Sequence, residues 1–296
     1  MTIREFHAYA KERLSCIYTI EEIRALAERL LEHCCSLPKY ALYTEPNREL
    51  PPSANDKISP LKWVEELAQG RPLQYLLGYE HFCGHKINVN SNVLIPRPET
   101  EELVQLILER HTTGKLTIAD ICTGSGCIAW ALAAALPPDA AIEGYDISAG
   151  ALEVAIGQAS NFPAVKKAPH FYRIDILREA LPEHSYNIIV SNPPYVLQSE
   201  RAQMRRNVCS EEPDIALFVP DKEPLLFYSA IARQAASRLA SGGSLYFEIN
   251  ERFGQQVCRM LEEEGFSKIE LHKDLFGKER FTSAQLRERA APLPYG

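Results

Sequence analysis

The stretch Leu116-Thr117-Ile118-Ala119-Asp120-Ile121-Cys122-Thr123-Gly124-Ser125-Gly126-Cys127 decides the fold predicted for this chain. Its first half is a short apolar run typical of a buried strand, and the alanine-rich segment that follows, as far as Leu136, is typical of a helix. The glycines between them allow the backbone to approach a ligand closely and turn the first N–H groups of the helix towards it. The sequence therefore predicts an α/β fold with a ligand-binding turn between a strand and a helix.

The sequence of the glycine turn also limits the class of ligand that it can bind. It is not the full G-x-G-x-x-G motif of dinucleotide-binding proteins, and no Lys-Ser or Lys-Thr pair follows it as in a P-loop. A second predicted strand, Ala141 to Tyr145, ends at Asp146, 22 residues after Gly124, where an acid can accept hydrogen bonds from both hydroxyls of a ribose. A lone aspartate at a strand end is often only a turn residue. The glycine turn and the spacing together favour a nucleoside ligand without a pyrophosphate.

Two further predicted strands end in residues suited to the same ligand. The third, His170 to Ile174, leads to Asp175 and Ile176, a carboxylate and an apolar side chain that can meet the edge and the face of an adenine. The fourth, Tyr186 to Ser191, leads to the Asn-Pro-Pro-Tyr sequence of residues 192–195. Because the carboxyl ends of parallel strands lie at one edge of a sheet, all four turns are expected to face one cleft.

The segment Asn192-Pro193-Pro194-Tyr195 has the groups needed to hold a planar NH2 group. The two prolines stiffen the loop and lack N–H donors, which leaves the carbonyls of Asn192 and Pro193 free to accept. Asn192 adds a side-chain acceptor and Tyr195 adds an aromatic face. An amide, or the exocyclic amine of adenine, fits two convergent acceptors and a stacking ring. Taken alone, the tetrapeptide is explained about equally well as a proline turn after a strand.

The length, charge and apolar content of the chain exclude several classes of protein. The chain has 296 residues, of which 46% are hydrophobic, with a net charge of -7 and a pI of about 5.7. This length suits two domains, and the acidic total argues against binding nucleic acid through bulk charge. No apolar run reaches the roughly 20 residues that span a bilayer, and the N-terminus has no signal-peptide core. We therefore expect a cytoplasmic protein.

The cysteines do not indicate a metal site. None of the eight forms a Cys-x-x-Cys pair, and their scatter is typical of reduced, mostly buried thiols. His33-Cys34-Cys35 contains residues that can bind a metal, but no second cluster completes a tetrahedral set. We expect ordinary helix residues there and no bound metal.

Three segments complete the predicted organisation. Residues 1–78 have apolar side chains at helical spacing, with Thr19 as the N-cap of one helix, and predict a small helical domain. Residues 79–95 predict a β-hairpin that turns at Asn90-Ser91-Asn92 and links this domain to a second one, residues 96–296. In the second domain, a fifth strand is followed by a helix and an antiparallel pair of strands.

Arg97 lies between two prolines at the start of a predicted helix. Pro96 and Pro98 hold the segment extended, which can aim Arg97 and the first helical turn, including Glu99, at a neighbouring loop. An ordinary helix entry is an equally reasonable interpretation, since proline and acidic residues are common at helix starts.

Taken in order, the glycine turn, Asp146, Asp175 and Asn192-Pro193-Pro194-Tyr195 resemble the Rossmann-like S-adenosylmethionine-dependent methyltransferases that modify a planar nitrogen. Longer runs make the chain closely similar to the HemK-type, or PrmC, release factor glutamine methyltransferases. These runs are Arg71-Pro72-Leu73-Gln74-Tyr75-Leu76-Leu77-Gly78, Val93-Leu94-Ile95-Pro96-Arg97-Pro98-Glu99-Thr100-Glu101, Glu212-Pro213-Asp214-Ile215-Ala216-Leu217, Glu248-Ile249 and Lys273-Asp274-Leu275-Phe276-Gly277-Lys278-Glu279-Arg280-Phe281. The tetrapeptide alone is shared with adenine N(6)-methyltransferases, whereas the run around Arg97 is much more specific.

The resemblance implies a fold, a cofactor and a substrate. The implied fold is a seven-stranded methyltransferase sheet of order 3-2-1-4-5-7-6, with a helical N-terminal domain of five-helix type and a hairpin linker. The implied cofactor is S-adenosyl-L-methionine, which leaves as S-adenosyl-L-homocysteine. The implied substrate is the glutamine of the Gly-Gly-Gln loop in class I peptide chain release factors, methylated on its side-chain nitrogen, N(5). The helical domain and the hairpin would help to hold the release factor.

The resemblance also implies residue roles. Asn192 and Pro193 would accept the two N–H groups of the substrate amide, Tyr195 would stack on it, and Arg97 with Glu99 would shape the tunnel wall. Asn192, Pro193 and Tyr195 are thus the implied catalytic residues. The implied substrate-binding set is Arg97, Glu99, Asn192, Pro193, Pro194 and Tyr195. The implied cofactor-binding set is Cys122, Thr123, Gly124, Ser125, Gly126, Asp146, Ile147, Asp175, Ile176 and Asn192. One departure is Cys122, where the family usually has glycine; its thiol either crowds the cofactor or points into the core.

Three alternatives stay open. A ribosomal-protein glutamine methyltransferase shares the catalytic loop and differs in its N-terminal domain. A nucleic-acid adenine N(6)-methyltransferase normally has a basic, aromatic target-recognition region, and the acidic total and the absence of such an insert weigh against it. A non-catalytic cofactor-binding scaffold is the third. We expect release factors as partners, a monomer, and no direct binding of nucleic acid or membrane.

Overall fold

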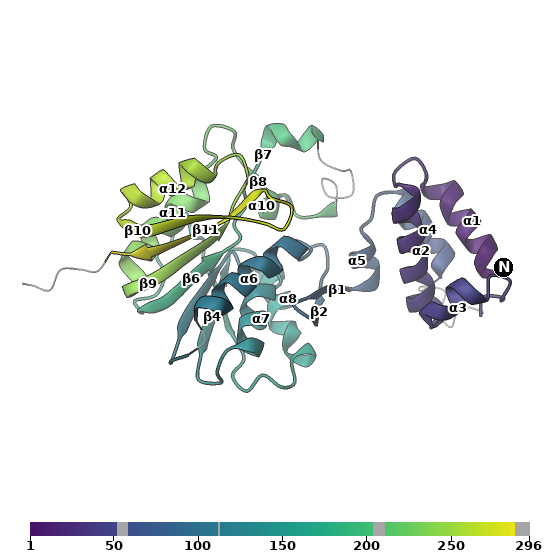
Figure 1. The fold of residues 1–296 in the computed structure, drawn as a ribbon, viewed down its shortest axis with the longest axis horizontal. Coiled ribbons are helices and arrows are strands. Elements are labelled where there is room, and N and C mark those ends of the chain that lie inside the picture. The colour runs from purple at the N-terminus through teal and green to yellow at the C-terminus, as the bar shows by residue number, and fades with distance from the viewer. Residues whose placement is uncertain (52–58, 112, 204–210, 288–296) are drawn as a thin grey trace, which may run out of the picture. The chain divides into compact units, whose positions relative to one another are not determined.

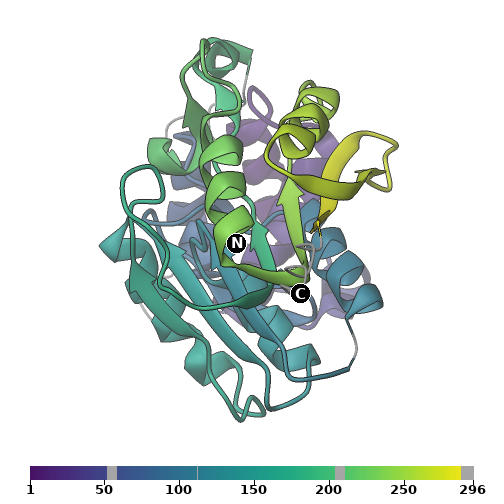
Figure 2. The ribbon, with the colours of Figure 1, turned by 90° about the vertical axis from the view of Figure 1, so that its left-hand side faces the viewer.

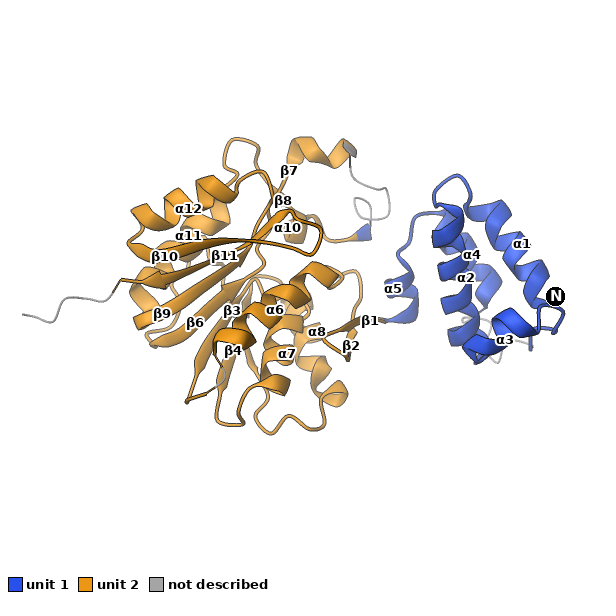
Figure 3. Ribbon diagram, viewed as in Figure 1, with its two compact units in different colours: residues 1–78, 205–211 blue, residues 79–204, 212–296 orange. Residues whose placement is uncertain are grey.

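The computed structural model describes residues 1–51, 59–111, 113–203 and 211–287. The chain divides into two compact units (Figure 3). The first comprises Met1–Gly78 together with residues 205–211, of which only Glu211 is described, and the second comprises the rest of the chain from Tyr79. The division between Gly78 and Tyr79 falls at the expected start of the hairpin.

The N-terminal unit is helical. Its described helices are α1 (Ile3–Leu14), α2 (Ile20–Cys35), α3 (Lys39–Thr44), α4 (Pro60–Ala68) and α5 (Leu73–Leu77). α1 and α2 both begin with a capping box, in which a threonine hydroxyl accepts an N–H bond and a glutamate three residues later bonds back to the cap N–H. Thr19 is the cap of α2, so the predicted helix start is confirmed. α1 and α2 pack on each other and on α4 through buried apolar residues such as Phe6, Leu30 and Val64.

The hairpin after Gly78 does not turn at the predicted place. β1 (Tyr79–Phe82) pairs antiparallel with β2 (His85–Asn88), so the chain reverses at Cys83-Gly84. Both turn residues have positive φ, 48° and 77°, as a two-residue type I′ turn requires. Asn90-Ser91-Asn92 makes a separate turn after β2, in which the Asn90 side chain accepts from the Asn92 N–H. The predicted hairpin turn was wrong because asparagines mark a turn without showing which turn joins two strands, and Cys83 is not a typical turn residue.

The second unit is built on a seven-stranded sheet of order β10-β11-β9-β6-β3-β4-β5 (Figure 1). Its strands are β3 (Thr117–Ile121), β4 (Ala141–Asp146), β5 (His170–Arg173), β6 (Tyr186–Ser191), β9 (Leu239–Glu248), β10 (Phe266–Lys273) and β11 (Glu279–Leu286). β3, β4, β5, β6 and β9 are paired in parallel, and β11 is antiparallel to both of its neighbours. Counted along the chain, this order is 3-2-1-4-5-7-6, so the predicted topology is confirmed.

Helices cover both faces of the sheet (Figures 1 and 2). α6 (Pro98–Arg110), α7 (Cys127–Ala135) and α8 (Ala149–Gly157) lie on one face, and α11 (Leu226–Arg238) and α12 (Gly254–Glu263) lie on the other. Shorter elements of this unit are α10 (Asp214–Leu217), β7 (Val196–Leu197), β8 (Phe218–Val219) and 3-10 turns at Gln158–Asn161 and Gln198–Gln203. Among the described helices of both units, none has the length and apolar character needed to cross a membrane.

A buried aspartate fixes the turn that follows β3. Asp120 is fully buried, and its Oδ2 accepts from the Thr123 hydroxyl at 2.6 Å and from the Ala129 N–H at 3.2 Å. Its Oδ1 has no hydrogen-bond partner among the described residues. Burial raises the pKa of Asp120 to about 7, although both hydrogen bonds favour the charged form. The turn is thus held by a carboxyl group that titrates near neutral pH.

Asp120 should make the stability of the fold depend on pH. Because its folded-state pKa is about 7 and its ordinary value is 3.8, the folded protein keeps a proton between these pH values that the unfolded chain has lost. The contribution of this group to the free energy of unfolding is complete below pH 3.8 and is lost as the pH rises towards about 7. Asp120→Asn stays neutral and keeps an oxygen for Thr123 and Ala129, so it should flatten the fall in melting temperature between about pH 4 and pH 7. An unchanged slope would contradict this assignment.

Candidate active site

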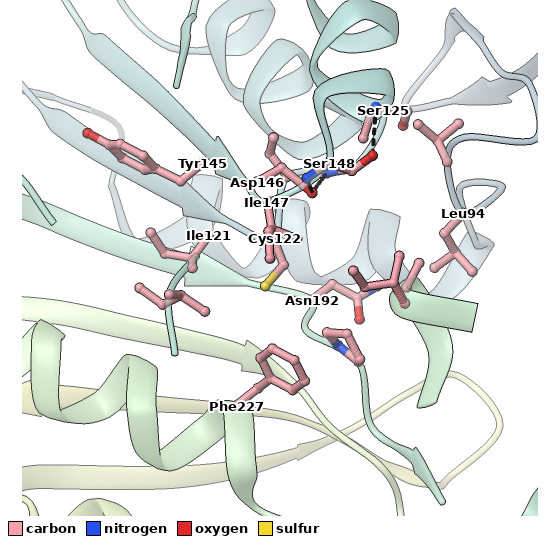
Figure 4. Close-up of a pocket in the computed structure, with 18 of the residues that line it drawn as sticks. Leu94, Ile121, Cys122, Ser125, Tyr145, Asp146, Ile147, Ser148, Asn192 and Phe227 are labelled. Carbon is pink, nitrogen blue, oxygen red and sulfur yellow. Dashed lines mark hydrogen bonds between the residues drawn. The ribbon is translucent and has the colours of Figure 1, made fainter. Parts of the chain in front are cut away.

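A pocket lies at the carboxyl ends of β3, β4 and β6 (Figure 4). It has a volume of about 250 Å³, and all of its lining residues belong to the second unit. Each of the four predicted turns contributes to it. The predicted site residues in its lining are Arg97, Cys122, Thr123, Gly124, Ser125, Asp146, Ile147, Asp175, Ile176, Asn192 and Pro194. The remaining predicted residues, Glu99, Gly126, Pro193 and Tyr195, are outside the lining.

The glycine turn has three residues in the left-handed region, Cys122, Gly124 and Gly126, with φ of 59°, 54° and 76°. Apart from its chain neighbours, no described residue has an atom within 4 Å of where a Cβ at Gly124 would lie, and Gly124 lines the pocket, so this backbone is open to it. A Cβ at Gly126 would lie 3.0 to 3.1 Å from three side chains of the helical layer and β5, including Trp130. Gly126 therefore allows α7 to pack closely, which explains its place outside the lining.

Cys122 has a positive φ of 59°, a conformation that glycine adopts more readily than cysteine. Its side chain packs against the main core cluster of the sheet and also lines the pocket. Figure 4 shows the sulfur pointing to the side of the pocket where Phe227 lies. Burial raises the pKa of the thiol well above its ordinary value, so Cys122 is a neutral wall residue.

Asp146 joins the turn after β3 to the end of β4. One of its carboxylate oxygens accepts from the Gly124 N–H and the other from the Ser148 N–H, both at 2.9 Å. Burial raises its pKa, and these N–H bonds oppose that effect. Each oxygen keeps a further lone pair for a ligand in the pocket. Asp146 is therefore both an anchor of the glycine turn and an acceptor that lines the cavity.

Asp175 and Ile176 form the wall after β5. The Asp175 carboxylate accepts from the Leu177 N–H at 3.1 Å and lies 3.5 Å from the guanidinium of Arg178. Ile176 packs into the core cluster and also lines the pocket. A carboxylate and an apolar side chain therefore line the pocket next to each other.

Asn192 lies at the end of a buried hydrogen-bonded chain. Its Nδ2 is 3.3 Å from the Thr100 Oγ1, and the Thr100 hydroxyl donates to Glu248 Oε2 at 2.6 Å. The Tyr195 hydroxyl donates to the other oxygen, Glu248 Oε1, at 3.0 Å. The ring of Tyr195 packs against the main core cluster. Thr100 and Glu248 were assigned no role from the sequence; the only signal was that both lie in runs that carry the family resemblance.

Arg97 is held by a buried partner, Glu212, to which the sequence alone assigned no role. Its guanidinium bonds Glu212 Oε1 at 2.6 Å, and Glu212 Oε2 accepts from the Ile95 N–H at 3.1 Å. The Glu212 side chain is 1% exposed, so the pair is shielded from water on one side. This contact fixes the segment before α6 to the segment before α10, whose Ile215 and Ala216 line the pocket.

The lining suits the cofactor expected from the sequence. Open backbone at Gly124 and the acceptor oxygens of Asp146 can hold the polar parts of a nucleoside with an amino-acid tail. Ile147, Ile176 and Leu177 supply apolar surface for a base. Within the described ranges, no three His, Cys, Asp or Glu side chains gather to bind a metal ion.

Two family models match the chain: the PrmC N-terminal domain over residues 5–78 and the methyltransferase small domain over residues 82–211. The chain is 41% identical to the release factor glutamine methyltransferase of Bacteroides thetaiotaomicron over 278 residues, covering 94% of this chain and 98% of that protein. It is 36% identical to the enzyme of the same name from Flavobacterium psychrophilum, covering 97% of this chain and all of that protein.

A solved methyltransferase structure from Pyrococcus furiosus has the same fold. It aligns with a TM-score of 0.50 and 14% sequence identity over 70% of this chain and 90% of its own. At this identity, the likeness concerns the fold alone. The relatives with the higher identity extend over nearly the whole length of both chains. The chain therefore belongs to the family of release factor glutamine methyltransferases.

Proposed function

We propose that this protein transfers the methyl group of S-adenosyl-L-methionine to the side-chain amide nitrogen, N(5), of the glutamine in the Gly-Gly-Gln motif of class I peptide chain release factors. The observation that carries the proposal is the meeting of Asn192, the glycine turn and Asp146 in one pocket. Membership of the release factor glutamine methyltransferase family supports the acceptor. The reaction supports translation termination by modifying the release factor.

Residues of three turns would hold the methyl donor. The backbone around Gly124 and the carboxylates of Asp146 and Asp175 face the cavity, and Ile176 offers an apolar surface. When bound, the donor supplies a methyl group on a positively charged sulfur. The apolar walls exclude water around that charge, which favours its loss as the methyl group leaves.

Asn192 and Pro193 position the acceptor nitrogen. An amide nitrogen is a poor nucleophile because its lone pair is delocalised into the carbonyl group. The Asn192 side-chain oxygen and the Pro193 carbonyl accept its two N–H bonds and so orient the nitrogen. Positioning of this kind can supply roughly 7 to 11 kcal/mol at best, so it is the main source of the rate.

The side chains beside Asn192 do not offer a strong base. The pKa of the Cys122 thiol is raised by burial, so the thiol stays protonated. Both oxygens of Glu248 already accept hydrogen bonds, from Thr100 and Tyr195. The proton of the methylated amide therefore leaves to solvent after transfer.

We also propose a role for each of the three parts of the chain. Residues 1–78 form the substrate-recognition domain, residues 79–95 the linker and residues 96–296 the catalytic domain. The match of residues 5–78 to the PrmC N-terminal domain supports this assignment. The protein acts as a monomer in the cytoplasm, without binding nucleic acid or membrane.

Methyl transfer to defined acceptors tests the function. We expect radiolabel from S-adenosylmethionine to enter a class I release factor and not the same factor with its Gly-Gly-Gln glutamine changed to alanine. A ribosomal protein fraction and adenine-containing DNA serve as the rival acceptors. Label in either rival, with none in the release factor, would overturn the proposed substrate.

Asn192→Ala separates catalysis from donor binding. We expect kcat to fall by roughly 10²-fold or more, because the acceptor nitrogen loses its orienting oxygen. The dissociation constant for S-adenosylmethionine, measured by calorimetry, should change by less than about threefold, which is under 1 kcal/mol. A large loss of donor affinity with kcat preserved would show that Asn192 has a different role.

Asp146→Asn tests the donor site. Loss of a charged acceptor should weaken S-adenosylmethionine binding by roughly 10- to 100-fold, in the range for hydrogen bonds to charged groups. Asp139→Asn is the matched control, because Asp139 is exposed and lies just before β4, at the opposite end of that strand. Calorimetric titration of both variants provides the measurement, and equal affinities would exclude Asp146 from the donor site.

A further inference from the structure

Behind Asn192, two buried side chains form a hydrogen-bonded chain that ends on a carboxylate. Asn192 Nδ2 contacts the Thr100 hydroxyl at 3.3 Å, and this hydroxyl contacts Glu248 Oε2 at 2.6 Å. Thr100 and Glu248 are 2% and 1% exposed. They come from α6 and β9, whereas Asn192 follows β6, so three separate elements build the chain.

The direction of these hydrogen bonds follows from the chemistry of the groups. An ionised carboxylate only accepts, and a threonine hydroxyl has one hydrogen to donate. Thr100 therefore donates its hydrogen to Glu248 and turns a lone pair towards Asn192. Only the NH2 end of the Asn192 amide can bond to that lone pair. Its oxygen must then point the other way.

Both oxygens of Glu248 accept hydrogen bonds, one from the Thr100 hydroxyl and one from the Tyr195 hydroxyl. Burial raises the pKa of Glu248, and these two hydroxyls and the charge of Arg280 offset that rise in part. Arg280 is itself held by Asp274, at 3.2 Å. The two hydroxyl donors and the Arg280 guanidinium thus reduce the free-energy cost of burying the Glu248 carboxyl group.

We propose that Thr100 and Glu248 are positioning residues that fix the orientation of the Asn192 amide, so that its oxygen, and not its NH2 group, faces the acceptor amide. This inference rests on the proposed methyl transfer to an amide nitrogen. The two ends of an asparagine amide have nearly the same size, so packing alone does not distinguish them. A rotated amide would place one NH2 group against another and leave the acceptor without its hydrogen-bond partner.

The same network assigns a task to Tyr195. Its hydroxyl donates to Glu248 Oε1 and leaves Oε2 for Thr100. Tyr195 therefore acts through Glu248 and indirectly supports Asn192, three residues before it in the same loop. The loop sequence thus contains both the residue that meets the acceptor and one that holds its support.

Thr100→Val and Thr100→Ser form the central test. Valine keeps the shape of the Thr100 side chain and removes its hydroxyl. We therefore expect kcat for the release factor to fall about tenfold or more, because a small misplacement of a group at a reacting centre can lower the rate by up to about 10²-fold. Serine keeps the hydroxyl and should recover most of kcat. Donor affinity should stay within about threefold in both, because Thr100 is in α6 and lines the pocket outside the glycine turn and the turns at Asp146 and Asp175. Thr282→Val is the control, because Thr282 is a fully buried threonine of β11 whose hydroxyl has no partner among the described residues.

A second measurement separates positioning from a loss of folding. In an Asn192→Ala background there is no amide to orient, so Thr100→Val should cause no further loss of the residual label transfer. A further loss equal to that in the wild-type background would assign Thr100 a general structural role and overturn the inference. If Thr100→Val does not fold, Glu248→Gln replaces it in both backgrounds, with the same expectation.

The outcomes distinguish this inference from the function on which it rests. If the wild-type protein does not methylate the release factor, the proposed function fails. If the wild type is active and Thr100→Val has the same kcat as wild type and as Thr282→Val, the positioning role fails while the function stands.

Discussion

The parallel pairing of β3 with β4 and with β6 is the constraint on which the site depends. Ile121 is in register with Tyr145 of β4 and with Ser191 of β6, so the next residues along the three strands are Cys122, Asp146 and Asn192. Neighbouring strands lie about 4.8 Å apart, which brings these three residues to one edge at short, regular intervals. Cys122, Asp146 and Asn192, which are far apart in the sequence, therefore meet at one edge of the sheet.

Buried carboxylates then hold the turns in place. Asp120 and Asp146 accept hydrogen bonds from the glycine turn and from the helices that follow, whereas Glu212 and Glu248 connect segments more than a hundred residues apart. An isolated buried charge is strongly unfavourable, but here hydroxyls, N–H groups or arginines compensate it. Of these four residues, Asp146 alone also lines the pocket; the other three hold its walls from behind.

The sequence anticipated the sheet order, the cap at Thr19 and the four turns that meet at the pocket, because these depend on local patterns: an apolar strand, a glycine turn, an acid at a strand end. It placed the hairpin turn wrongly, since Cys83 and Gly84 leave a weaker turn signal than the asparagines that follow. It counted Gly126 among the cofactor residues, and the structure shows that this glycine also allows close packing under α7. A glycine required for packing and one required for a ligand look the same in a sequence.

The sequence by itself determined the fold class, the four turns and the family, because short apolar strands followed by glycine, aspartate or Asn-Pro-Pro-Tyr form a pattern along the chain. Only the tertiary structure decided which side chains stand behind that pattern. Thr100 and Glu248 are 148 residues apart, and so nothing in their spacing predicts that a hydroxyl of one will donate to the carboxylate of the other. Their contact arises because α6 packs against β9, and it places a directional hydrogen-bonded chain next to Asn192.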